Sequence, residues 1–133
     1  MSSNLGIYNQ LVHLNADSAP SDVVKAVVKF EKAFRRGQGD AGFILGCLFN
    51  PDNMMLSDTV KQEIGATHEK SRTYFKAAHS ILMHEALAGN GRSMHMIAVY
   101  YQSGLPPVSY DSEQYEYWKN KALNAGYRGA GQL

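Results

Sequence analysis

The chain has 133 residues, of which 44% are hydrophobic and 19% charged, a composition typical of one folded domain and not of a disordered chain. Thirteen basic and twelve acidic residues leave a net charge of +1, which argues against a protein that binds nucleic acid or an anionic membrane. The single cysteine, Cys47, excludes an internal disulfide framework and a cysteine-rich zinc site.

No targeting or membrane-spanning segment is evident. The sequence 1–12 lacks a basic stretch followed by an apolar one, which argues against a secretory signal. No apolar run approaches the roughly 20 residues that a membrane-spanning helix needs. Together with the lone cysteine, these features predict a cytoplasmic protein that contacts no membrane.

The apolar residues recur at three- and four-residue spacings along most of the chain, which predicts helices, and no segment reads convincingly as a strand. The predicted helices cover residues 5–14, 22–36, 40–49, 67–88, 92–103 and 111–126, with a short helix inside the loop 51–66. Side chains that cap helix amino termini precede four of these segments: Ser21, Ser57, Thr67 and Asp111. Glycines that end helices follow three of them: Gly37, Gly104 and Gly126.

Two glycine pairs, Gly37 with Gly39 and Gly89 with Gly91, stand near helix starts. Neither follows a strand or carries a phosphate-binding lysine, so both are interpreted as tight turns and not as nucleotide sites. The basic residues of the segment 29–36 are interpreted as a solvated helix face.

Internal similarity connects the two halves of the chain. The sequence ILGCLF at 44–49 aligns with MIAVYY at 96–101, since each places a small residue among long apolar ones and ends on an aromatic. In the helices that follow, Ala78 aligns with Ala122. Without insertions the repeating unit is about 37 residues, within the range of helix-turn-helix repeats. The small residues predict close helix contacts, with Ala78 and Ala122 buried.

Two motifs carry a resemblance to a known family. They are Ala41-x-x-x-Leu45-Gly46-x-x-Phe49 and Tyr115-x-x-Trp118-x-x-Lys121-Ala122-x-x-x-Gly126. Over residues 22–133 the chain resembles the Sel-one-like repeat family, α-solenoids related to tetratricopeptide repeats. The resemblance implies a scaffold or adaptor that binds another protein, in a bacterial and signalling setting.

The expected fold is therefore all-α, a short right-handed α-solenoid of antiparallel helix pairs with about two to two and a half repeats. We expect a single domain in four parts. These are an amino-terminal capping helix (1–20), a first helix pair with an inserted loop (21–66), a second pair (67–104), and a last helix with a truncated repeat start (105–133).

Candidate catalytic and metal-binding residues are few. His79 and His84 are five residues apart and so do not share a helix face as a metal-binding pair would. Cys47 lies within an apolar helix, where an inert thiol is the common case. We predict no catalytic residues, no bound metal and no cofactor. An all-α enzyme that uses His84 and Glu85 is an alternative.

The expected function is a non-catalytic protein–protein interaction module, and the expected partner is another protein, with a homodimer left open. Stacked helical units present long shaped surfaces to such a partner. The positions that the repeat leaves free predict the binding surface: Phe43, Leu48, His95, Tyr100 and Tyr117. Loop 50–66 is the alternative site. A phage- or effector-type inhibitor that blocks a host protein is the alternative function.

Overall fold

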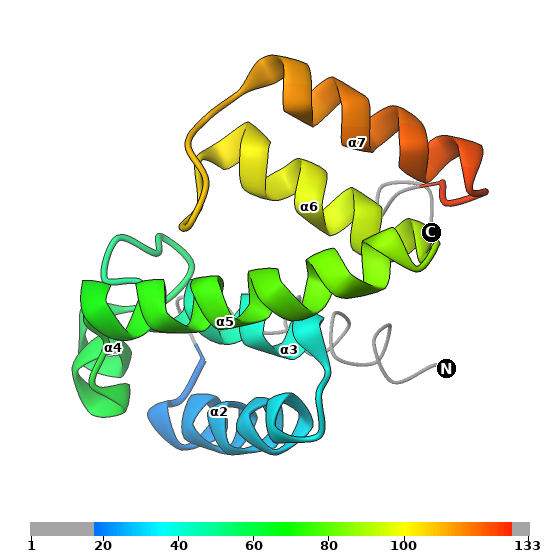
Figure 1. Cartoon of the computed structure of the whole chain (residues 1–133). Helices are drawn as coiled ribbons and strands as arrows, with labels where there is room; N and C mark the ends of the chain where they lie inside the picture. The colour runs from blue at the N-terminus through cyan, green and yellow to red at the C-terminus, as the bar shows by residue number, and fades with distance from the viewer. Residues whose placement is uncertain (1–17, 129–133) are drawn as a thin grey trace. The chain divides into compact units, whose positions relative to one another are not determined.

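The computed structural model of the protein describes residues 18–128, and these fold into six α-helices joined by turns and loops (Figure 1). The helices are α2 (Pro20–Arg35), α3 (Gly39–Phe49), α4 (Asp58–Ile64), α5 (His68–Leu87), α6 (Gly91–Ser103) and α7 (Ser112–Asn124). No strand occurs within residues 18–128, which confirms the predicted all-α class for this part of the chain. The helix predicted over 5–14 lies outside the described residues.

Local sequence signals account for most helix ends. The Ser57 hydroxyl accepts a hydrogen bond from the Val60 amide at 3.2 Å, and Thr67 accepts one from the Lys70 amide at 3.1 Å. The Asp111 carboxylate accepts bonds from two amides of the first turn of α7. These three predicted caps are confirmed, and each satisfies donors that a helix leaves free.

The predicted Ser21 cap is wrong. Helix α2 begins at Pro20, and Ala19 stands at the N-cap without a side-chain hydrogen bond. Proline suits the first helical position because its ring fixes φ and it has no amide to satisfy. Ser21 therefore lies inside the first turn.

The predicted tight turns are confirmed. Gly37 and Gly89 have φ values of +93° and +104°, a left-handed conformation that a side chain would strain. Gly104 ends α6 in the same region, at +66°. Within residues 18–128, no helix is both long and apolar enough to cross a membrane.

By its internal contacts the chain divides into two compact units, Met1–Ala78 (the first unit) and His79–Leu133 (the second unit), and the division falls within α5. In the first unit α2 packs against α3 and α4. Its core consists of buried apolar residues of these helices and of the loop before α4: Val23, Val27, Phe30, Ala33, Ala41, Ile44, Leu45, Leu48, Phe49, Leu56 and Val60.

Helix α3 approaches α5 closely within the first unit. The Ser71 hydroxyl donates a 2.6 Å hydrogen bond to the Gly46 carbonyl, so α3 supplies backbone to a side chain of α5. A Cβ atom at Gly46 would lie 2.7 Å from the Phe75 ring, and one at Gly42 would lie 2.9 Å from the Ala78 Cβ. The predicted burial of Ala78 is confirmed, and small residues hold this contact together.

In the second unit α6 and α7 lie side by side, and the chain reverses direction between them (Figure 1). Trp118 and Ala122 of α7 are buried, which confirms the prediction for Ala122. The Asn90 side chain caps α6, and the Ser93 hydroxyl donates a 2.7 Å hydrogen bond to the Glu85 carboxylate. Glu85 thereby ties the end of α5 to the start of α6.

Candidate functional site

The structure contradicts the exposure predicted for two of the five partner-binding residues. Tyr100 is 0% exposed and Leu48 is 1% exposed, so neither side chain is available to a partner. Tyr100 follows the buried residues Met96 and Ile97 by four and three positions, which places all three on one helix face. Leu48 stands in the same relation to Ile44 and Leu45. The predictions were wrong because both helices are buried over a wide arc and not along one stripe.

The other three predicted residues reach the surface to different degrees. Tyr117 is 52% exposed and lies edge-on against Trp118, with ring centroids 5.3 Å apart. Phe43 is half-buried and packs edge-on against Phe75. His95 is half-buried beside Tyr127, at 5.1 Å between centroids. Phe43 belongs to the first unit, whereas His95 and Tyr117 belong to the second.

The titratable side chains named from the sequence have mainly structural contacts. Burial raises the pKa of the Cys47 thiol to about 12, which keeps it protonated and poorly nucleophilic. His79 lies edge-on to the buried Tyr100 ring, and burial lowers its pKa. His84 is exposed. Among residues 18–128, no three His, Cys, Asp or Glu side chains are grouped so as to hold a metal ion.

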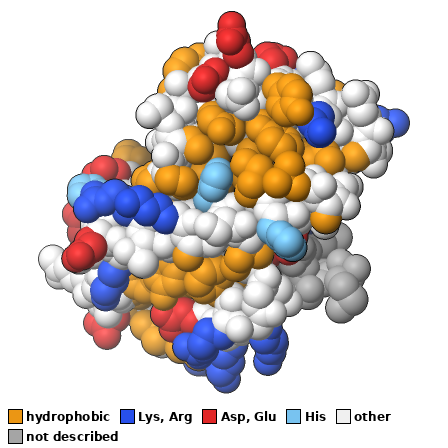
Figure 2. Space-filling model, in the orientation of Figure 1, with side chains coloured by type: hydrophobic (Ala, Val, Ile, Leu, Met, Phe, Trp, Pro, Cys, Tyr) orange, Lys and Arg blue, Asp and Glu red, His pale blue; other side chains and the backbone are white. Residues whose placement is uncertain are grey.

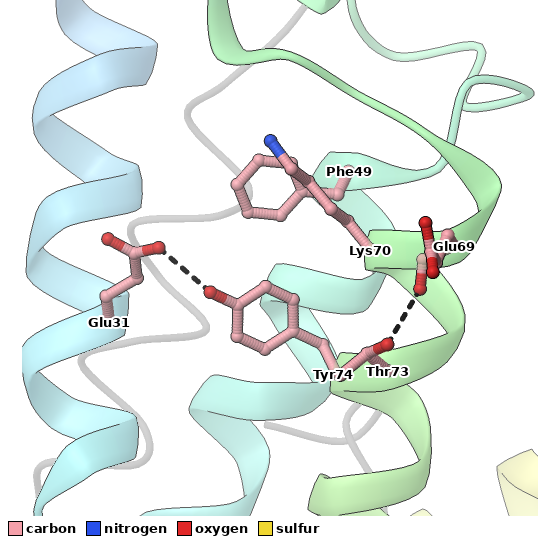
Figure 3. Close-up of a pocket in the computed structure, with 6 residues that line it drawn as sticks. All are labelled: Glu31, Phe49, Glu69, Lys70, Thr73 and Tyr74. Carbon is pink, nitrogen blue, oxygen red and sulfur yellow. Dashed lines mark hydrogen bonds between the residues drawn. The ribbon is translucent and has the colours of Figure 1, made fainter.

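A pocket of about 340 Å³ opens in the first unit, and its walls come from three helices. Helix α2 supplies one lining residue, α3 another, and the first half of α5 the rest (Figure 3). The lining residues are Glu31, Phe49, Glu69, Lys70, Thr73 and Tyr74. This volume lies at the lower end of the roughly 300–1,000 Å³ typical of ligand pockets. It suits one side chain or a comparably small group.

Two stacked aromatic rings form the apolar part of this pocket. The Phe49 and Tyr74 rings are nearly parallel, with an interplanar angle of 9° and centroids 5.4 Å apart. Phe34 packs edge-on against Tyr74, with the two ring centroids 5.8 Å apart. Tyr74 is half-buried, so part of its surface remains open to the pocket. Edge-on and stacked contacts of this kind hold the rings in fixed orientations.

Charged groups surround the rings. The Tyr74 hydroxyl donates a 2.9 Å hydrogen bond to Glu31 Oε2, which Figure 3 shows across the pocket from α5 to α2. The Lys70 ammonium lies 5.3 Å from the centroid of Phe49 in a cation–π contact. Glu69 completes the rim, where its backbone carbonyl accepts a hydrogen bond from Thr73.

The environment of Tyr74 changes its acidity. Burial is the main cause that raises the pKa of Tyr74 to about 12, and the Glu31 hydrogen bond and charge raise it further. Arg35 on α2 acts in the opposite direction. At neutral pH Tyr74 is therefore a protonated donor, and Glu31 is held beside it as an acceptor.

The sequence does not predict this pocket. Lys70 and Tyr74 are four residues apart on one helix, a spacing that places them on the same face. The approach of Glu31, 43 positions earlier, depends on the tertiary packing and leaves no local signal. Figure 2 shows apolar side chains gathered on the face drawn, with charged groups beside them.

Comparisons with known proteins add no relative. No known family model, no curated protein and no solved structure matches this chain.

Proposed function

We propose that this protein is a non-catalytic interaction module, and that the pocket of the first unit holds a side chain of a partner protein. The observation that carries this proposal is the stacked pair Phe49–Tyr74 at the base of an open pocket. Aromatic residues are enriched where proteins bind one another, because they offer a large rigid contact area with little entropy to lose.

The pocket is also prepared for binding before any partner arrives. Its aromatic rings are fixed by mutual packing, and the Tyr74 hydroxyl is oriented by Glu31. A rigid site loses less conformational entropy on binding than a flexible one, and this favours affinity. The walls come from three different helices, so the geometry of the site depends on the fold and not on one segment.

Several broader features belong to the same proposal. We infer a short right-handed α-solenoid of antiparallel helix pairs, related to the Sel-one-like repeats and working in the cytoplasm of a bacterium or its phage. The buried small residues Ala78 and Ala122, at aligned positions of the repeat, support the solenoid.

Selection from a random peptide library displayed on phage tests the function directly. We expect the full chain to enrich peptides, and synthetic copies of them to bind. Thr73→Trp fills the pocket from its exposed rim and should weaken these peptides at least tenfold. Lys76→Trp is the matched control, since Lys76 is exposed on the same helix and does not line the pocket.

Tyr117→Ala separates the pocket from the surface predicted by the sequence. If the selected peptides lose affinity with Tyr117→Ala and keep it with Thr73→Trp, binding belongs to the second unit and the pocket assignment is wrong. If the folded chain enriches no peptide, the proposed function itself is wrong.

A further inference from the structure

We propose that the pocket of the first unit receives a basic side chain, the guanidinium of an arginine or the ammonium of a lysine in the partner protein. This inference rests on the proposed function and names the chemistry of the group that enters the pocket. Two features of the site carry it, the aromatic faces and the carboxylates of the lining, of which Glu31 lies beside Tyr74.

The aromatic faces already accept a cation. Lys70 places its ammonium 5.3 Å from the Phe49 centroid, which is within the distance at which a ring quadrupole attracts a positive charge. The molecule thus shows, with its own side chain, that the base of the pocket is compatible with a cation. A guanidinium would also stack flat on such a ring, because it is planar and weakly hydrated.

The carboxylates supply the charge that a basic side chain needs. Glu31 uses one carboxylate oxygen to accept the Tyr74 hydrogen bond, and within residues 18–128 its other oxygen has no hydrogen-bond donor and no ion-pair partner. Glu69 lines the opposite rim, and its carboxylate likewise has no ion-pair partner in the described part of the chain. A cation on the ring faces would therefore meet Glu31, an acceptor with unused capacity beside Tyr74, and such charge-assisted hydrogen bonds are the strong ones.

Two cations near the pocket would repel a basic side chain, and their effect on its binding can be tested. Lys70 is the cation of the lining, and Arg35 on α2 is close enough to influence Tyr74. The Lys70 side chain belongs to an exposed residue, so its long stem can swing into solvent and leave the ring to the incoming group. Removal of Lys70 should then tighten binding, whereas removal of Glu31 should weaken it.

The experiment uses four synthetic peptides of glycine and serine that differ at one central position. This position holds arginine, lysine, citrulline or glutamate, and citrulline matches arginine in shape but is neutral. Binding to the full chain is followed by NMR, from the aromatic ring signals of Tyr74 and Phe49 during titration. We expect the arginine and lysine peptides to shift these signals and to bind at least tenfold more tightly than the citrulline peptide.

Two variants and their matched controls test the cause. Glu31→Gln should weaken the arginine peptide about tenfold, equal to about 1.4 kcal/mol, and Lys70→Met should strengthen it several-fold. Glu63→Gln and Lys76→Met, exposed residues outside the lining, should change nothing. Thermal unfolding of each variant confirms that the fold is retained.

Three results would overturn the inference, and the first two of them would leave the proposed function in place. Equal binding of citrulline and arginine would mean that shape alone selects the side chain. Binding of the glutamate peptide, lost with Lys70→Met, would mean that the pocket takes an anion. The absence of any shift at Tyr74, while peptides selected from the library bind the chain, would place recognition elsewhere.

Discussion

Tyr74 combines three roles within one side chain. Its ring stacks on Phe49, its edge meets Phe34, and its hydroxyl crosses to Glu31 on another helix. The phenol is therefore both part of the packing and part of the pocket wall. A core ring without a hydroxyl partner would not orient Glu31, so the polar group at the tip of Tyr74 decides how the carboxylate faces the pocket.

The acidity of Tyr74 offers a direct check of this contact. Glu31→Gln removes a charge that disfavours tyrosinate, so the pKa of Tyr74 should fall from about 12 toward its ordinary value of 10.0. It should stay above 10.0, because burial is the larger cause and remains. NMR titration of ring-labelled tyrosine measures this pKa. A pKa unchanged by Glu31→Gln, or lowered equally by Glu63→Gln, would contradict the contact.

Tyr100 is the residue whose position differs most from expectation. Its side chain is 0% exposed and lies 5.0 Å from the His79 ring. Tyr100→Ala should lower the free energy of unfolding by about 3–5 kcal/mol, since truncation of a buried aromatic leaves a cavity. Tyr117→Ala, at a half-exposed site on α7, should cost less than about 1 kcal/mol. Urea unfolding measures both, and equal losses would show that burial does not distinguish the two.

At the scale of single residues, the sequence predicts the contacts that a side chain makes with its neighbours within one helical turn. The caps at Ser57, Thr67 and Asp111 follow from a side chain and the amides next to it, and they are confirmed. Ser21 failed because Pro20 offered a competing start one position earlier. The contact between Glu31 and Tyr74 could not be predicted, since it depends on how α2 and α5 come together.

At the scale of the elements, α3 is buried in the first unit and lies in close contact with α5. Nearly all of its residues are buried, and glycines face α5 where a larger residue would not fit. Ser71 of α5 is buried. Its hydroxyl donates a hydrogen bond to the Gly46 carbonyl, so this buried polar group has a backbone partner. Small residues and one polar contact together set the distance between these two helices.

Gly46→Ala tests this close approach. An added Cβ would lie 2.7 Å from the Phe75 ring, so the ring or the helix must move. We expect a loss of about 1–3 kcal/mol in the free energy of unfolding, although alanine is the better helix former. Phe75→Leu in the same chain should recover part of this loss. If urea unfolding shows the two substitutions to be additive, the ring is not what opposes the methyl group.

The helices themselves were predictable to within about two residues at most ends. Their signals are local, because apolar spacing, caps and glycines all act within the segment that they define. The breadth of burial was not predictable in the same way. A single stripe of apolar residues indicates one buried face, whereas α3 and α6 are buried over a much wider arc. For this reason the sequence predicts Leu48 and Tyr100 on the surface, although both are buried.

At the scale of the whole molecule, the described part of the chain is all-helical, as the sequence predicts, and the small residues Gly46, Ala78 and Ala122 are buried in it. The division of the chain into two compact units within α5 has no sequence signal, since the periodicity of that helix runs through it without a break. The single-domain organisation and the solenoid both stay predictions.

Two half-buried histidines connect the stability of the molecule to pH. Burial lowers the pKa of His79, and burial together with the charge of Arg92 lowers the pKa of His95. In the described part of the chain, Nε2 of His79 is buried without a hydrogen-bond partner, so a proton there would find no acceptor. Both rings therefore favour the neutral form in the folded state.

The sign of the effect follows from this preference. At a pH well above 6.5, the ordinary histidine pKa, both states are neutral at these sites and the stability is complete. As the pH falls below 6.5, the unfolded chain takes up protons first, and the free energy of unfolding decreases until the folded pKa is passed. The slope is at most about 1.4 kcal/mol per pH unit for each histidine.

His79→Phe keeps a ring beside Tyr100 and removes the titration, so it should flatten the profile between pH 6.5 and 5. His84→Gln, at an exposed site on α5, is the matched control and should leave the profile as it is. Urea unfolding across this range decides the matter, and an equal slope in wild type and His79→Phe would show that His79 does not make the fold acid-sensitive.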